Sequence, residues 1–135
     1  MLMPKKTKWR KDQKRRRGGQ ASRNLEISFG SYGLKSLTAC WVTSRQIEAA
    51  RRVMTQYVKK GGQIWIRIFP DKPVTMHGGE IPMGKGKGAV DHYVAVVKPG
   101  TVMFEMEGLN RETAKRAMEL AGHKLPVKCQ FISKE

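Results

Sequence analysis

The residues best suited to phosphate chemistry form an alternating run of glycine and lysine, Gly84-Lys85-Gly86-Lys87-Gly88. Glycines allow a backbone to approach phosphates closely, and lysines neutralise their charge. The run is not a P-loop, because no Ser or Thr follows either lysine. It is not a dinucleotide fingerprint either, because residue 89 is Ala and no strand-to-helix pattern surrounds it. We interpret the run as a loop that contacts phosphates; the alternative is a solvated loop without a ligand.

No group of residues is spaced as catalysis or metal binding requires. The three histidines and two cysteines lie too far apart for the local zinc spacings. Glu105 and Glu107 could make a carboxylate pair, but they share the outer face of an expected strand and are interpreted as a solvated edge. No nucleophile is paired with a base. We therefore expect no enzyme, no metal site and no cofactor, and free thiols at Cys40 and Cys129.

The 135-residue chain carries a net charge of +16, from 27 basic and 11 acidic side chains. Ten of the basic side chains and one acidic side chain lie in residues 1–24. A polyanion offsets such self-repulsion most readily, so nucleic acid is the expected partner. The longest apolar stretch, Tyr93–Val97, has five residues, against roughly 20 for a membrane span, so no membrane partner is expected.

The length allows one domain, which we place at residues 25–135, after a basic arm at residues 1–24 that lacks a core of its own. Alternation predicts a strand over Leu25–Phe29, Gly30 and Gly33 mark a turn, and residues 34–42 are read as extended.

The spacing of Thr43 and Gln46 predicts a capping box. It opens a helix that ends at Gly61-Gly62, with Lys59 and Lys60 in the last turn. The apolar stripe of this helix consists of Ile47, Ala50, Met54, Tyr57 and Val58.

In the second half, a strand is expected over Gln63–Phe69, and residues 71–91 form a long loop with a short strand at 74–76. Residues 93–98 and 102–107 flank Pro99-Gly100 and are predicted to pair as a hairpin. Asn110 caps a second helix, and a last strand contains Val127, Cys129 and Phe131. The fold class is α+β, a single compact domain with two helices packed on an antiparallel sheet.

Two sets of side chains could contact RNA outside the glycine run. Arg45, Arg52 and Lys59 recur at intervals of seven on the expected first helix, which places them opposite the apolar stripe and favours a phosphate-contacting face. Trp65, Arg67 and Phe69 interleave on the outer face of the following strand and could stack on unpaired bases. We prefer the other interpretation of these three, a packed layer under a helix or the arm.

The sequence closely resembles the bacterial-type large-subunit ribosomal proteins of the L-sixteen family over essentially its whole length. The resemblance rests on the segments MLMPKKTKWRK, FGSYGLKSL, TSRQIEAARRVMTQYVKKGGQIWIRIFPDKPVT, MGKGKG, VAVVKPGTVMFEM and HKLPVKCQFI. It implies an α+β domain bound to large-subunit ribosomal RNA near the path of incoming aminoacyl-tRNA. It also implies contacts with A-site tRNA that extend to P-site tRNA, and with other large-subunit ribosomal proteins. A cytoplasmic ribosome is favoured over an organellar one, and no small-molecule substrate is implied.

The resemblance directs the basic arm into RNA and the loop of Met83, Gly84, Lys85, Gly86, Lys87 and Gly88 towards tRNA. With the charge pattern, it gives a predicted set of rRNA-binding residues: Lys5, Lys6, Lys8, Arg10, Lys11, Lys14, Arg15, Arg16, Arg17, Arg23, Arg45, Arg51, Arg52, Lys59, Lys60 and Lys72.

The chain departs from the family pattern at three places, one of which is the tail from Asp12 to Gly19, where the match is loose and only the charge is carried over. Pro82 stands where relatives usually carry an arginine that some bacteria hydroxylate, so no such modification is expected. His77-Gly78-Gly79 replaces a common Lys-Pro, so the loop is expected to differ in shape and tRNA contacts. The alternative from another functional class is a free-standing RNA-binding or chaperone-like protein, and an enzyme that binds a nucleotide on the glycine run ranks third.

Overall fold

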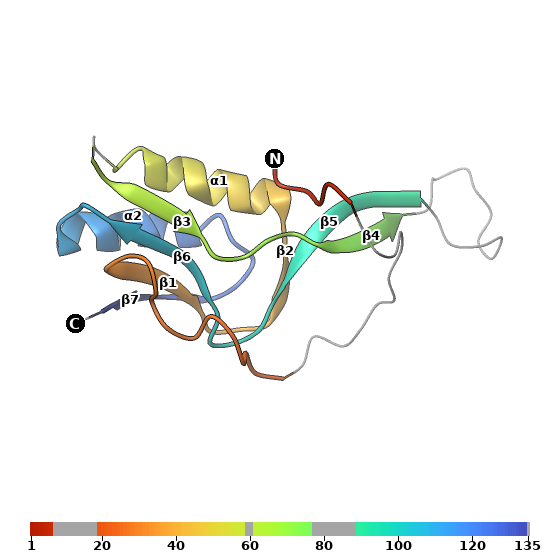
Figure 1. Ribbon diagram of the computed structural model, residues 1–135, viewed down its shortest axis with the longest axis horizontal. Coiled ribbons are helices and arrows are strands. Elements are labelled where there is room, and N and C mark those ends of the chain that lie inside the picture. Colours follow the sequence, from red (N-terminus) through yellow and green to blue (C-terminus); the bar gives the residue numbers. More distant parts are fainter. Residues whose placement is uncertain (7–18, 59–60, 77–88, 135) are drawn as a thin grey trace.

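The computed structural model describes residues 1–6, 19–58, 61–76 and 89–134, in which two helices and two antiparallel sheets are arranged in layers (Figure 1). This confirms the α+β class, although the strands divide into two sheets. Neither helix in these ranges is long and apolar enough to cross a membrane.

The larger sheet has the strand order β3-β6-β1-β7. Its strands are β3 (Gln63–Ile66), β6 (Val102–Glu107), β1 (Tyr32–Ser36) and β7 (Cys129–Ser133). The register places Leu34 opposite both Phe104 and Phe131. Leu34 and Phe104 are buried in the core between this sheet and the helices.

Helix α1 (Ser44–Thr55) begins at the predicted capping box. The backbone N–H of Gln46 donates to Thr43 Oγ1 at 3.2 Å, and the N–H of Thr43 donates to Gln46 Oε1 at 2.9 Å. Ile47, Ala50 and Met54 are buried, as predicted. The predicted end at Gly61 is wrong, because after Thr55 the chain tightens into turns in which an N–H bonds three residues back, as from Tyr57 to the Met54 carbonyl.

Helix α2 (Arg111–Gly122) begins at Asn110, whose Oδ1 accepts from the N–H of Thr113 at 2.8 Å. Its buried stripe matches the prediction and consists of Ala114, Ala117, Met118 and Ala121. The helix packs against α1, β1 and β7. Three alanines in this stripe allow the helix to approach these neighbours closely.

The smaller sheet has the order β2-β5-β4, with β2 (Cys40–Thr43), β5 (Ala89–Val97) and β4 (Lys72–Met76). Strands β4 and β5 run side by side away from the helices, towards the right of Figure 1. Strand β4 confirms the short strand expected at 74–76, whereas residues 89–91, expected in the long loop, belong to β5. Residues 77–88, which join these two strands and include the glycine-lysine run, lie outside the described residues.

The predicted hairpin of residues 93–98 and 102–107 is wrong, although its turn forms. Gly100 has φ +99°, and the N–H of Thr101 donates to the Lys98 carbonyl at 3.2 Å, as a type II turn requires. The turn instead joins two sheets, because β5 pairs with β2 and β4 while β6 pairs with β1 and β3. Two hydrogen bonds between Ser36 and the residues Gly100 and Thr101, both 2.8 Å, attach the turn to β1.

The strand predicted over Leu25–Phe29 is also wrong, and so is the turn at Gly33, which lies within β1. Residues 25–30 cross the outer side of the larger sheet as an irregular segment. Gly30 permits this close passage, since a Cβ there would lie 2.6 Å from the Met106 carbonyl oxygen. Residues 37–39 interrupt the extended stretch predicted at 34–42, and β3 ends at Ile66 instead of Phe69.

Candidate nucleic-acid interface

The outer side of α1 presents arginines on the face opposite its buried stripe. Arg45 and Arg52 are exposed, and three quarters of the Arg52 side chain is accessible. Arg51 is partly exposed beside them. Arg45 makes no ion pair within the described part of the chain. This face offers guanidinium groups that can approach a phosphate backbone without disturbing the core.

Glu48 moderates the charge of this face. Its carboxylate accepts from Arg51 Nη2 at 2.5 Å and Arg51 Nε at 3.0 Å, and from Arg52 Nε at 3.3 Å. The hydrogen bond from Arg51 is the main reason that the pKa of Glu48 falls to about 2. Glu48 is therefore ionised at neutral pH, and it holds Arg51 more tightly than Arg52.

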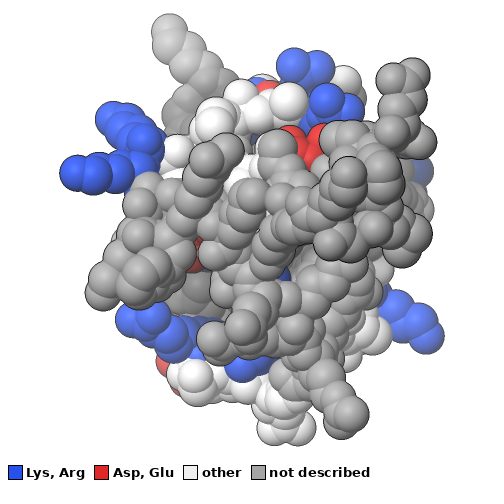
Figure 2. All heavy atoms as spheres, turned by 90° about the vertical axis from the view of Figure 1, so that its right-hand side faces the viewer, with Lys and Arg blue, Asp and Glu red and all other residues white. Residues whose placement is uncertain are grey.

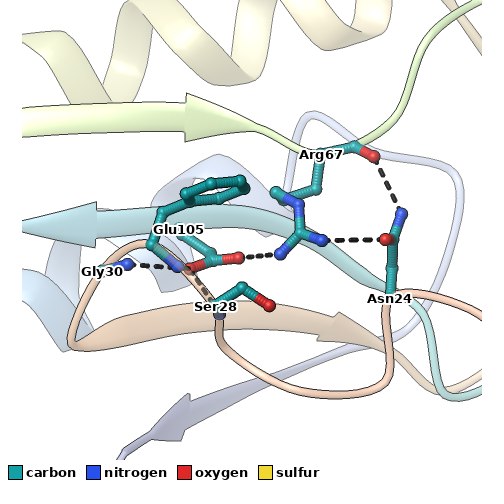
Figure 3. A network of polar contacts seen from close by, with 6 residues as sticks. Asn24, Ser28, Gly30, Arg67 and Glu105 are labelled. Carbon is teal, nitrogen blue, oxygen red and sulfur yellow. Dashed lines mark hydrogen bonds and ion pairs between the residues drawn. The ribbon is translucent and has the colours of Figure 1, made fainter.

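Another arginine, Arg67, lies in a buried network on the outer side of the larger sheet (Figure 3). Glu105, on β6, is fully buried, and its Oε1 accepts three consecutive backbone N–H groups, from Ser28 at 3.0 Å, Phe29 at 2.6 Å and Gly30 at 2.8 Å. Its Oε2 accepts from Arg67 Nη1. The interpretation of Glu105 as a solvated edge residue is therefore wrong, since residues 28–30 cover it.

The network fixes the charge of Glu105. Burial by itself raises the pKa of this carboxyl, but the amide hydrogen bonds and Arg67 outweigh burial, so its pKa lies below the ordinary value. Arg67 Nη2 also donates to Asn24 Oδ1 at 2.8 Å, and Asn24 Nδ2 donates to the Arg67 carbonyl at 3.0 Å. The pair thus joins the root of the arm, β6 and the segment after β3.

Trp65, Arg67 and Phe69, the interleaved aromatic and cationic residues, do not share one environment. Trp65 stacks on Phe29, with ring centroids 6.0 Å apart, and the Arg67 guanidinium lies 4.9 Å from the centroid of Phe29. The preferred interpretation of a packed layer is confirmed for Trp65 and Arg67. Phe69 differs, because 45% of it remains exposed.

The remaining predicted cations differ in accessibility. Lys5, Lys6 and Arg23 are exposed, whereas Lys72 is buried, with its Nζ 5.3 Å from the Trp41 ring centroid. Figure 2, viewed from the end where β4 and β5 lie, shows Lys and Arg side chains at several places around the edge of that face. The other predicted residues lie outside the described ranges: Lys8, Arg10, Lys11, Lys14, Arg15, Arg16, Arg17, Lys59, Lys60 and Met83 to Gly88.

Comparison with known proteins decides the family. The family model described as ribosomal protein L16p/L10e matches residues 4–132. The chain belongs to the L16p/L10e family. It is 58% identical to the large ribosomal subunit protein uL16 of Trichodesmium erythraeum, over all of this chain and 98% of that protein. It is 55% identical to uL16 of Heliobacterium modesticaldum and 53% identical to uL16c of Gracilaria tenuistipitata, over all of this chain and 94% and 100% of those proteins.

Membership of the L16p/L10e family identifies a structural protein of the large ribosomal subunit that acts in translation and is not an enzyme. Its place is in the ribosome. Cys40 and Cys129 are both free, and burial raises the pKa of the Cys129 thiol to about 11, so this thiol is protonated at neutral pH.

The residue that sequence reasoning missed in this L16p/L10e-family chain is Glu105. The two neighbours on its face of β6 give opposite signals, since Met103 is apolar and Glu107 is charged, and residues 28–30, which cover the carboxylate, lie more than 70 positions away. The available signal was an acidic residue placed between apolar residues, Phe104 and Met106, inside the strand.

Proposed function

We propose that this protein binds large-subunit ribosomal RNA through the basic arm and the outer face of α1, and that the loop of Met83 to Gly88 contacts A-site tRNA and extends to P-site tRNA near the peptidyl transferase region. The observation that carries the rRNA proposal is the exposure of Arg45 and Arg52 opposite the buried stripe of α1 in a chain of net charge +16. A polyanion neutralises such a face with little reorganisation of the protein.

The charge of the C-terminal region supports the assignment of rRNA binding to the arm and α1. Residues 99–135 carry six basic and five acidic side chains, so α2 has a nearly balanced surface. The excess of positive charge lies in the arm and in the middle of the chain. In the arm, the exposed side chains of Lys5, Lys6 and Arg23 contribute to it. We assign the arm to residues 1–24. Its last residue, Asn24, hydrogen-bonds Arg67 and so attaches the arm to the domain.

The rRNA proposal is tested with the double substitution Arg45→Gln and Arg52→Gln in the full chain. Binding to large-subunit rRNA is measured by filter retention over a series of salt concentrations. The slope of log affinity against log salt should become shallower by about 2, roughly one per lost phosphate contact. The matched control, Lys115→Gln with Arg116→Gln on α2, removes the same charge and should change the slope much less. Equal changes in both variants would contradict a role for this face.

The tRNA proposal is tested with Lys85→Ala and Lys87→Ala together. Since the arm and α1 keep their cations, the variant should assemble into large subunits, as judged by sucrose-gradient sedimentation. The assembled subunits should bind tRNA about tenfold more weakly, equivalent to about 1.4 kcal/mol. Poor assembly with normal tRNA binding by the subunits that do form would make the loop an rRNA anchor instead.

A further inference from the structure

A hollow of about 420 Å³ lies between the root of the arm and the two sheets. One wall is formed by residues 21–24, another by Arg67, Ile68 and Phe69, and a third by residues at the end of β5 and the following turn. Its volume falls within the range of sites that hold small organic groups, roughly 300–1,000 Å³. None of the cations on α1 contributes to its lining, so the hollow is distinct from that face.

The lining combines apolar and cationic groups. Phe69 and Val96 are each 45% exposed and line the same hollow, so their apolar surface is accessible to a ligand that enters it. Arg23 and Lys98, both exposed, bring positive charge to the rim, and Asp71 brings a carboxylate. An exposed aromatic ring beside cations is the combination that proteins use to stack an unpaired base and hold its phosphate.

Hydrogen bonds hold the walls in place before any ligand arrives. The N–H of Ala21 donates to the Pro99 carbonyl at 3.1 Å, and the N–H of Val102 donates to the Asn24 carbonyl at 2.6 Å. The side-chain amide of Asn24 in turn bonds Arg67 twice, with Oδ1 accepting from the guanidinium and Nδ2 donating to the Arg67 carbonyl. The network around Glu105 therefore also builds this hollow, and a ligand that enters it meets a preorganised surface.

We propose that this hollow receives one unpaired nucleotide of large-subunit rRNA, with its base stacked on Phe69 and its phosphate against Arg23 and Lys98. The Asp71 carboxylate can accept a hydrogen bond from a base amino group. The inference rests on the proposed rRNA binding and assigns a base contact to a protein whose other predicted contacts are with phosphates. Residues 1–20, the rest of the basic arm, are poor occupants, because their net charge has the same sign as Arg23 and Lys98.

The test uses the full chain with Phe69→Ala and, as a second variant, Phe69→Leu, which keeps apolar packing but removes the ring. Both should bind large-subunit rRNA about tenfold more weakly, with an unchanged salt slope, because stacking is lost while phosphate contacts remain. The matched control is Leu37→Ala, a side chain 47% exposed that does not line the hollow. It should bind as the wild type does.

Chemical probing of the bases supplies a positional readout. The wild type should protect an unpaired base that both Phe69 variants leave reactive and the Leu37 variant still protects. If the wild type binds rRNA with the expected salt dependence but the Phe69 variants behave like the control, the hollow is not a base site and only this inference fails. If the wild type itself shows no salt-dependent rRNA binding, the proposed function fails. A photocrosslinking residue at Val96 that couples to a protein, not to RNA, in assembled subunits would also overturn the inference.

Discussion

Two glutamates, each hydrogen-bonded to arginine, have different roles in this protein. Glu105 is fully buried and binds Arg67 and three backbone N–H groups, so both charges belong to the interior. Glu48 lies on the surface of α1 and pairs with Arg51 and Arg52, which remain accessible to solvent. The first pair holds two distant parts of the chain together, whereas the second adjusts the charge offered to a polyanion. Burial, not residue type, decides which role an ion pair takes.

The largest effect is expected from Glu105→Ala. This substitution leaves Arg67 buried without its carboxylate and three N–H groups without an acceptor, so the free energy of unfolding should fall by about 3 to 5 kcal/mol. Urea unfolding of the full chain measures it. The control, Glu107→Ala, removes an exposed carboxylate from the same strand and should change stability by less than about 0.5 kcal/mol. A similar small loss in both variants would mean that the buried pair does not hold the segment of residues 28–30.

The stabilisation that Glu105 provides through this buried pair should depend on pH. The pKa of Glu105 is lowered in the folded protein from its ordinary value of 4.5, so its ionised form stabilises the fold above pH 4.5. This stabilisation is lost as the pH falls from 4.5 through the lower folded pKa. The gap in unfolding free energy between the wild type and Glu105→Gln should therefore be widest near neutral pH and should narrow in acid. A constant gap from pH 7 to pH 3 would contradict this.

Phe29→Ala should have an intermediate effect. The ring is 57% exposed, yet it stacks on Trp65 at an interplanar angle of 21° and lies under the Arg67 guanidinium. Loss of these ring contacts should lower the free energy of unfolding by about 0.5 to 1.5 kcal/mol. Leu37→Ala, also an exposed apolar residue, serves as the control and should cost less. Equal losses would show that the ring stack adds nothing to the buried pair beneath it.

Glu48→Gln should have the smallest effect on stability, because exposed ion pairs on a helix contribute little. Its effect on RNA binding should be opposite in sign to that of the arginine substitutions. Arg51 and Arg52 lose their carboxylate partner and become available to phosphates, so the salt slope should steepen by up to about 1. Glu119→Gln on α2 is the matched control, and weaker binding by the Glu48 variant would show that Glu48 positions the arginines instead of competing for them.

Both helix starts could be predicted from the sequence because each depends on neighbours a few residues apart. Thr43 and Gln46 bond each other, Asn110 bonds Thr113, and the buried stripes follow from the helical period alone. The type II turn at Pro99-Gly100 is local in the same way. The exposure of Arg45 and Arg52 followed from their place opposite Ile47 on α1. These features, with the net charge, determined the class of the fold and the expected polyanionic partner.

Only the tertiary structure decided which strands pair and which charges are buried. Strands β5 and β6 are adjacent in sequence and alternate as a hairpin would, but their partners come from β2, β4, β1 and β3, so they enter different sheets. Residues 25–29 alternate like a strand, yet the amides of Ser28 and Phe29 bind Glu105. Strand pairing and burial depend on groups far apart in the chain, and the period of a sequence carries no information about the distant residues that complete them.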